Sequence, residues 1–161
     1  MRILVANDDG IESPGLAALA QAARGLTDDV WIVAPERKWT AASHQLTFGA
    51  DVTLRKLGDR RFATSGAPAD CVAGAMTVLF TGDEPKPDFV VSGVNDGRNA
   101  GEDVAYSGTL AIAREATFWG IPAIGFSRTK VPAWNAADTA ALTDILARFW
   151  ATRSDWRLEG H

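Results

Sequence analysis

The sequence has few of the residues that build thiol or zinc chemistry. Its 161 residues include one cysteine and two histidines, so an intramolecular disulfide is excluded and a zinc site of Cys and His ligands is implausible. It has no excess of positive charge either, since 16 Lys and Arg stand against 20 Asp and Glu, a formal net charge of −4. That balance argues against the broad basic surface of a nucleic-acid binder. A bound metal is therefore expected to sit mostly on oxygen ligands.

Long hydrophobic runs are missing as well. No stretch approaches the roughly 20 apolar residues of a membrane span, and the apolar run over residues 3–6 is too short for a secretory signal. Together with the single thiol and the acidic balance, this predicts a cytoplasmic protein with neither a membrane nor a nucleic acid as partner. With 47% hydrophobic and 22% charged residues, the chain is predicted to form one globular domain over residues 1–161.

Short apolar runs alternate with longer helical patterns along the chain, which is typical of a parallel sheet covered by helices on both faces. We therefore predict an α/β fold. The expected strands are 3–6, 30–33, 89–91 and 123–126, and the expected helices are 14–24, 68–80, 107–118 and 136–150. Segments 52–54 and 61–64, separated by Gly58 and Asp59, suggest a hairpin. Segments 36–47 and 93–101 are expected to be loops.

A pair of carboxylates, Asp8 and Asp9, follows the first expected strand. Ligands of open parallel sheets bind beyond the carboxyl ends of the strands, so this position places the pair at the expected site. Adjacent carboxylates repel each other, and a divalent cation between them keeps both ionised. A polar turn before a helix is the alternative interpretation.

Two further polar clusters are expected at the same edge of the sheet. The glycine-rich segment 92–101 contains Asn95 and Asn99, whose amides can coordinate a hard cation or donate to a phosphate. Ser107, Gly108 and Thr109 open a helix, where free N–H groups and the helix dipole favour an anion. A tight turn and an ordinary N-cap are the respective alternatives. The convergence of all three clusters favours a hard cation together with a phosphate.

Several of these strings resemble the SurE family of 5′/3′-nucleotidases. The matching segments, in order within residues 1–127, are 2–15, 33–35, 92–95, Asn99, Gly101, Asp103, 106–109 and Glu115. The resemblance implies a divalent-metal-dependent phosphomonoesterase that hydrolyses nucleoside 5′- and 3′-monophosphates. It also implies a Rossmann-like three-layer αβα sandwich with a mostly parallel sheet.

The resemblance also assigns roles to individual residues. One divalent cation, Mg²⁺ or Mn²⁺, would be held by Asp8, Asp9, Thr40 and Asn95. The phosphate would be bound by Asn95, Asn99, Ser107, Gly108 and Thr109. Catalysis would involve Asp8, Asp9 and Asn99. Thr40 stands where the family has a serine, and Ala41 stands where the family has a glycine, so the loop that carries Thr40 is expected to be altered.

Members of this family continue into a C-terminal extension that exchanges between subunits. The resemblance therefore implies that residues 1–161 form a SurE-like phosphatase domain without that extension. A homodimer is expected from the resemblance, although the missing C-terminal extension weakens that expectation. The expected substrate is a nucleoside monophosphate.

Four other side chains have open interpretations. Trp39, beside Thr40, could stack on a nucleobase or simply pack, and His44 in the same loop could donate a proton to the leaving oxygen or be solvated. Cys71 lies on an apolar helix stripe and is expected to be buried. Arg98 could bind phosphate or face solvent.

Three rival functions share part of this pattern. A signalling receiver domain also opens on paired aspartates, but it needs a phospho-accepting aspartate and a lysine, for which Asp96 and Lys130 are loose candidates, and segment 36–87 argues against it. A haloacid dehalogenase phosphatase needs an aspartate at position 10, which is Gly10. A nucleotide-binding remnant without catalysis is the third alternative.

Overall fold

The computed structural model describes residues 1–129 and 133–155. In this part of the chain six strands form one sheet in the order β3-β4-β2-β1-β5-β6. The strands are β1 (Ile3–Ala6), β2 (Val30–Pro35), β3 (Leu54–Gly58), β4 (Arg61–Thr64), β5 (Phe89–Asp96) and β6 (Ala123–Arg128). All neighbours pair in parallel except β3, which runs antiparallel to β4 at one edge. The prediction of a mostly parallel sheet is confirmed.

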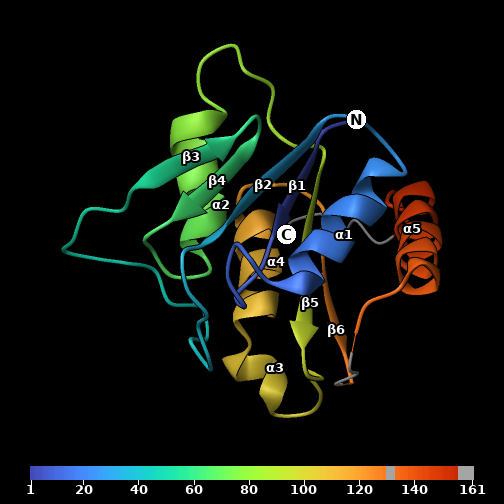
Figure 1. Ribbon diagram of the computed structural model, residues 1–161. Helices are drawn as coiled ribbons and strands as arrows, with labels where there is room; N and C mark the ends of the chain where they lie inside the picture. Colours follow the sequence, from blue (N-terminus) through green and yellow to red (C-terminus); the bar gives the residue numbers. More distant parts are fainter. Residues whose placement is uncertain (130–132, 156–161) are drawn as a thin grey trace.

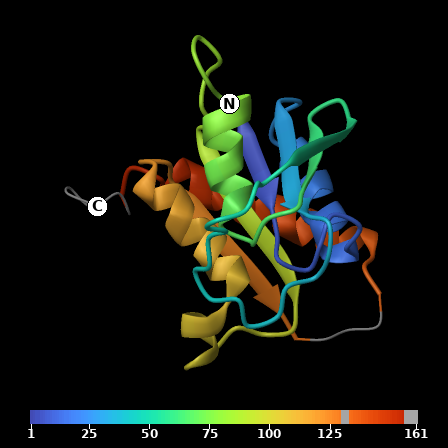
Figure 2. The ribbon, with the colours of Figure 1, turned by 90° about the vertical axis from the view of Figure 1, so that its left-hand side faces the viewer.

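Helices cover both faces of the sheet (Figures 1 and 2). One face carries α1 (Pro14–Arg24) and α5 (Ala136–Ala151), and the other carries α4 (Gly108–Phe118) and α2 (Asp70–Gly74) with its π-helical continuation η1 (Ala75–Leu79). A one-turn helix, α3 (Asp103–Tyr106), precedes α4. The fold is a Rossmann-like αβα sandwich, as predicted.

Strand β1 lies at the centre of the sheet because both of its faces are apolar. Ile3 and Val5 pack into the core beneath α1 and α5, whereas Leu4 and Ala6 pack into the core beneath α2 and α4. All four are fully buried. A continuous apolar run is what a parallel strand covered on both faces requires.

Strand β5 is longer than predicted. It extends through Asp96, so the first half of the expected loop 93–101 is strand. Gly93 suggested a turn, but its backbone has a φ of +115° and a Cβ there would lie 2.3 Å from the carbonyl oxygen of Phe126. This glycine therefore permits the close approach of β6 in a conformation that other residues rarely adopt.

The expected hairpin is also displaced. Gly58 belongs to β3, so the turn falls on Asp59 and Arg60 rather than on Gly58 and Asp59. The hairpin is not a separate excursion, because β4 pairs with β2 and extends the main sheet. The expected helix 68–80 begins at Asp70 and changes to π-helical hydrogen bonding over its last turn.

Two predictions about single residues have different outcomes. Cys71 is fully buried, as predicted, and burial raises the pKa of its thiol well above the usual value. Lys130 lies outside the described residues. No helix within 1–129 and 133–155 combines the length and apolar character needed to cross a membrane.

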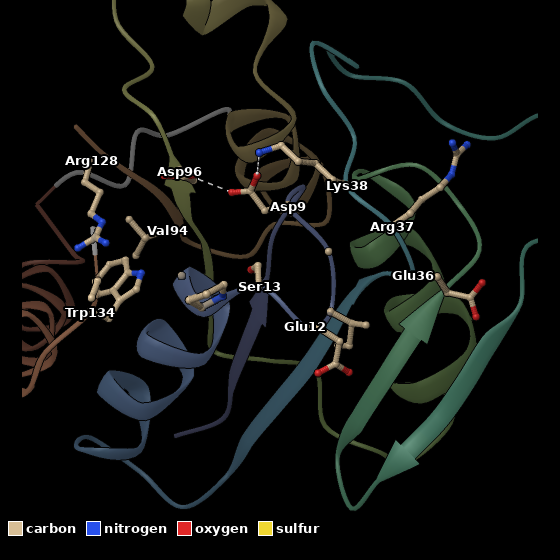
Figure 3. A pocket seen from close by; sticks show the side chains of 15 residues that line it. Asp9, Glu12, Ser13, Glu36, Arg37, Lys38, Val94, Asp96, Arg128 and Trp134 are labelled. Atoms are coloured by element: carbon tan, nitrogen blue, oxygen red, sulfur yellow. Dashed lines mark hydrogen bonds and ion pairs between the residues drawn. The ribbon is translucent and has the colours of Figure 1, made fainter. Parts of the chain in front are cut away.

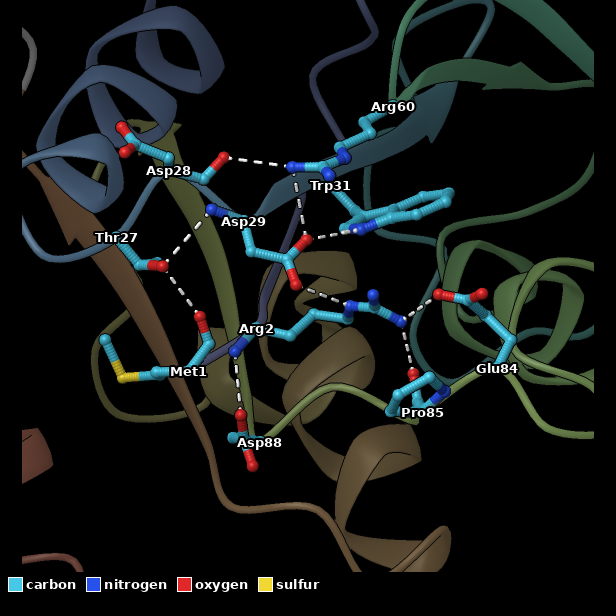
Figure 4. Close-up of polar contacts among 10 residues, drawn as sticks. All are labelled: Met1, Arg2, Thr27, Asp28, Asp29, Trp31, Arg60, Glu84, Pro85 and Asp88. Atoms are coloured by element: carbon cyan, nitrogen blue, oxygen red, sulfur yellow. Dashed lines mark hydrogen bonds and ion pairs between the residues drawn. The ribbon is translucent and has the colours of Figure 1, made fainter.

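At the amino ends of the strands, Arg2 joins three segments of the chain (Figure 4). Its guanidinium bonds Asp29 at 2.9 Å and Glu84 at 2.5 Å, and its backbone N–H donates to Asp88 at 2.7 Å. The other Asp29 oxygen accepts from the indole of Trp31 at 2.9 Å. Partial burial would raise the pKa of Asp29, but the bonds from Arg2 and Trp31 outweigh it and hold that pKa below its usual range.

Replacement of Asp29 by asparagine is expected to lower the free energy of unfolding at pH 7 by less than about 1 kcal/mol, because the group is partly exposed and screened. The folded pKa is depressed, so this contribution is present above the unfolded pKa of about 3.9 and is lost as the pH falls through the folded value. Urea unfolding at pH 7 and pH 3 would measure it. Asp28→Asn, an exposed neighbour, serves as control. A gap between Asp29→Asn and the parent that persists unchanged at pH 3 would contradict the assignment.

Candidate functional site

The order of the strands creates a crevice at the carboxyl ends of β1 and β5. Strand β1 has β2 on one side and β5 on the other. The chain reaches β2 through α1 on one face of the sheet, and it reaches β5 through α2 on the opposite face. Such a switch point is where open α/β sheets bind ligands. Asp8 and Asp9 follow β1, and Asn95 and Asp96 end β5, so the first two predicted clusters share one edge.

The turn that presents the two carboxylates is held by Asn7. This side chain is fully buried; its Oδ1 accepts from the N–H of Gly10 at 3.2 Å, and its Nδ2 donates to Ser13 Oγ at 2.5 Å. Ser13 in turn caps α1 by accepting from the N–H of Leu16 at 3.3 Å. The residue that caps α1 therefore also fixes the turn that carries Asp8 and Asp9.

Asp8 lies against the first turn of α4. Its Oδ1 accepts a hydrogen bond from Thr109 Oγ1 at 2.6 Å, and a Cβ on Gly108 would approach the Asp8 Cβ to 2.8 Å. Burial raises the pKa of Asp8 above its usual range, with the hydrogen bond from Thr109 opposing this rise and the charge of Asp9 adding to it. A cation beside Asp8 would stabilise the ionised form that burial disfavours.

Asp9 joins three segments at the same point (Figure 3). One oxygen pairs with Lys38 Nζ at 2.5 Å, and the other accepts from the backbone N–H of Asp96 at 2.9 Å. The pairing with Asp9 raises the pKa of Lys38, and the charges of Asp96 and Asp8 add to this effect. Lys38 was missed at the sequence level, because no periodicity or motif marks a residue that reaches back from the loop after β2.

Ser107 and Asn99 lie together at the start of α4, as predicted. Ser107 caps the helix by accepting from the N–H of Leu110 at 3.2 Å, and its hydroxyl donates to Asn99 Oδ1 at 3.0 Å. Asn99 is also held by its backbone N–H, which donates to Ser127 Oγ at 3.0 Å. With its carbonyl oxygen engaged, Asn99 has its NH₂ group left as a donor.

The chain neighbours of Thr40 and Asn95 contact the two carboxylates: Trp39 bonds Asp8, and Asp96 bonds Asp9. The backbone N–H of Trp39 donates to the carbonyl oxygen of Asp8 at 2.8 Å, which places the backbone just before Thr40 next to the turn that carries the two carboxylates, while the Thr40 side chain itself is exposed. Asn95 Nδ2 donates to Gly97 O at 2.8 Å, which leaves the Asn95 amide oxygen as a potential ligand.

The site therefore offers carboxylate, amide and hydroxyl oxygens, the donors that hard cations such as Mg²⁺ and Mn²⁺ take. Its Asn and Thr members matter, because no cluster of three or more His, Cys, Asp or Glu side chains that could hold a metal occurs in the described part of the chain. The ammonium of Lys38 already lies beside Asp9, which shows that this position accepts positive charge.

The predicted change at Ala41 has a structural counterpart. Ala41 has a φ of 52°, in the left-handed region that favours glycine. An alanine in this region costs about 1 kcal/mol or more, so the loop must be held by contacts elsewhere. The resemblance described above implies a glycine at this position.

A cleft of about 1070 Å³ opens beside Asp9 and Lys38 and crosses the start of α1 to reach Arg128 and Trp134 (Figure 3). Its size suits a small-molecule ligand. The Arg128 guanidinium lies 3.5 Å from the centre of the Trp134 ring. Sequence reasoning singled out neither residue.

The structure also bears on the open interpretations of Trp39, Arg98 and His44. The indole N–H of Trp39 is buried, and Arg37 lies 4.7 Å from its ring, which favours packing over base stacking. Arg98 is exposed. His44 is not simply solvated, because its Nε2 lies 2.8 Å from Glu115 Oε2.

Comparison with known proteins gives a consistent result. A family model described as "Survival protein SurE" matches residues 3–156. A 5′-nucleotidase SurE of Beijerinckia indica is 52% identical over 129 residues, which cover 80% of this chain and 48% of the relative. A 5′-nucleotidase SurE of Bradyrhizobium diazoefficiens is 47% identical over 158 residues, which cover 94% of this chain and 60% of the relative.

The fold has a solved counterpart as well. The crystal structure of a SurE protein from Aquifex aeolicus superposes with a TM-score of 0.82 at 37% identity, covering 94% of this chain and 60% of that one. The chain thus spans about half to three-fifths of the length of these relatives.

Proposed function

The chain belongs to the SurE family, and from this membership we propose that it is a metal-dependent phosphomonoesterase that hydrolyses nucleoside 5′- and 3′-monophosphates. One observation carries the proposal: Asp8, next to Asp9 at the end of β1, is bonded at 2.6 Å to Thr109 in the first turn of α4. A cation-binding carboxylate pair and an anion-binding helix start therefore adjoin each other, which is the arrangement that phosphoryl transfer requires.

The cation would be held by the four oxygen donors of the site, Asp8, Asp9, Thr40 and Asn95. When bound, it would act as a Lewis acid on a phosphoryl oxygen and lower the pKa of a bound water. Asp8 and Asp9, presented from their fixed turn, would hold the cation and orient a water beside it. The hydrogen bond from Thr109 Oγ1 fixes the orientation of the Asp8 carboxylate.

The phosphate would be held by the start of α4. Ser107 caps the N–H of Leu110, whereas the N–H groups of Gly108 and Thr109 come earlier in the first turn and have no acceptor within the helix. These two N–H groups lie at the positive end of the helix dipole. The NH₂ of Asn99, oriented by Ser107, adds a further donor. These groups stabilise the charge that gathers on the phosphoryl oxygens in the transition state.

A phosphate-release assay tests this function. The purified chain is incubated with nucleoside 5′- and 3′-monophosphates in Mg²⁺, Mn²⁺ or chelator, and a full-length SurE relative serves as positive control. Metal-stimulated release is expected from the nucleotides. Binding of a nucleotide without release would support a non-catalytic remnant instead. A stable aspartyl phosphate would support a signalling receiver domain. The family match over residues 3–156 disfavours both the receiver domain and the haloacid dehalogenase phosphatase.

Replacement of Lys38 by methionine is expected to tighten Mn²⁺ binding about three- to fivefold. Removal of the ammonium that pairs with Asp9 leaves the carboxylates of Asp8, Asp9 and Asp96 uncompensated, and one exposed ion pair is worth up to about 1 kcal/mol. Titration calorimetry without nucleotide measures this affinity. Lys56→Met, an exposed change on β3, should have no effect. Weaker Mn²⁺ binding by Lys38→Met would mean that Lys38 supports the site rather than competing for it.

The cytoplasmic location, the single-domain organisation and the homodimer stay predictions. The nucleoside monophosphate substrates, 5′ and 3′, are part of the function proposed above.

A further inference from the structure

We propose that the His44–Glu115 pair anchors the loop that carries Thr40 to helix α4, so that His44 is a positioning residue for the metal site. The loop meant here is residues 39–47. The inference rests on the proposed function for the role of Thr40, but the anchor itself is a contact between two segments that can be tested separately.

The histidine ring is enclosed by α4. Its Nε2 lies 2.8 Å from Glu115 Oε2, and the ring stacks on Phe118 with centroids 5.4 Å apart and planes 10° from parallel. Nδ1 faces the guanidinium of Arg114 at 3.5 Å. Glu115 is itself fixed, because it is buried and its second oxygen accepts from the indole of Trp119 at 2.9 Å. The pair is therefore a specific contact rather than a chance surface encounter.

Other contacts hold the loop on both sides of His44, but those from Trp39, Ser43 and Thr47 do not reach α4 itself. At one end the Trp39 N–H bonds the Asp8 carbonyl, and at the other Thr47 Oγ1 bonds Asp70 at 2.6 Å. Between them, Ser43 donates from its N–H to Tyr106 O and from its hydroxyl to Ala105 O, at 3.0 and 2.9 Å. His44 adds the contact that reaches the body of α4.

The backbone of the loop needs such anchors. Ala41 and Ser43, on either side of Ala42, have φ values of 52° and 51°. Left-handed conformations of residues other than glycine persist when surrounding contacts determine them. No helix or strand spans 39–47, so its shape is fixed by individual backbone and side-chain contacts with the rest of the protein.

The anchor joins both halves of the proposed site. Glu115 lies on α4, the helix whose first turn holds Asp8 through Thr109 and presents N–H groups to the phosphate. Through His44, the loop with Thr40 is attached to that same helix. The position of the fourth metal ligand is thereby set relative to the phosphate-binding turn.

The geometry also separates this role from proton donation. Both ring nitrogens of His44 face partners on α4, Glu115 and Arg114. A proton donor to a leaving oxygen would have to direct one nitrogen into the site instead.

Mn²⁺ titrations of phosphate release by two variants test the anchor. His44→Ala is expected to raise the half-saturating Mn²⁺ concentration about tenfold and to leave kcat at saturating Mn²⁺ within about threefold. His44→Gln, whose amide N–H can still donate to Glu115, should restore most of the affinity. Gln45→Ala, an exposed change in the same loop, is the matched control. If His44 is instead the proton donor, both variants lose kcat at saturating Mn²⁺ and keep the parent's metal affinity.

Hydrogen exchange of residues 39–47 gives a readout that needs no activity. We expect faster exchange in His44→Ala and near-parent exchange in His44→Gln and in Glu115→Gln, whose amides can still bond across the pair. Unchanged exchange and unchanged Mn²⁺ dependence in His44→Ala would overturn the proposal. A parent protein that releases no phosphate would contradict the proposed function, while the exchange result would still decide the anchor.

Discussion

Replacing Asp8 by asparagine is expected to abolish metal-stimulated phosphate release, with a fall in kcat/KM of about a thousandfold or more. The charge that holds the cation is lost, and Lewis-acid stabilisation of the transition state is worth several kcal/mol; about 4 kcal/mol corresponds to about a thousandfold. Initial rates with a nucleoside 5′-monophosphate over a range of Mn²⁺ concentrations would measure the effect.

The same substitution is expected to leave the fold intact. Asparagine has the same shape and keeps an oxygen that can accept from Thr109, as Asp8 Oδ1 does at 2.6 Å. Because burial disfavours the charged form of Asp8, the variant without metal should unfold at the same temperature as the parent or a higher one. The increase in unfolding temperature that Mn²⁺ gives the parent should disappear.

An exposed Asp→Asn exchange provides the matched control. Asp59 lies in the turn between β3 and β4, away from the carboxyl ends of β1 and β5, and Asp59→Asn should retain the activity and the Mn²⁺ response of the parent. Substantial phosphate release by Asp8→Asn would refute the assignment of this carboxylate as a metal ligand.

Features with local signals could be predicted from the sequence. Ser13 followed by Pro14, and Ser107 before a helical pattern, mark helix starts because a short polar side chain satisfies free N–H groups. Both residues cap their helices. The position of Asp8 and Asp9 follows equally, since an apolar strand buried on both faces must end where the chain turns polar.

Contacts between distant segments could not be predicted. Asp9 pairs with Lys38 and with the N–H of Asp96, and His44 pairs with Glu115, 71 residues away. No local pattern marks such partners, because they are brought together by the order of strands in the sheet. Gly93 shows the same limit: it suggested a turn, whereas close approach of β6 is what requires it.

Replacement of Gly15 by alanine is expected to destabilise the protein by about 1–2 kcal/mol. Helix propensity alone predicts the opposite, because alanine is favoured over glycine by about 1 kcal/mol within a helix. A Cβ at position 15 would, however, lie 2.1 Å from the carbonyl oxygen of Val94, with the Val94 carbonyl carbon at 3.2 Å. These are backbone atoms of β5, so relief requires α1 to move away from the sheet. Overpacking of this kind costs about 1–3 kcal/mol and occasionally more, which outweighs the gain in propensity.

The effect should extend from stability to the metal site. Ser13, two residues before Gly15, is bonded by Asn7, and Asn7 shapes the turn that carries Asp8 and Asp9. A displaced start of α1 should therefore raise the Mn²⁺ concentration needed for half-maximal activity as well as lower the urea midpoint. Gln21→Ala, an exposed change in the same helix, should alter neither quantity. A Gly15→Ala protein as stable as the parent, or more so, would show that helix propensity outweighs the contact and that α1 is not held tightly against β5.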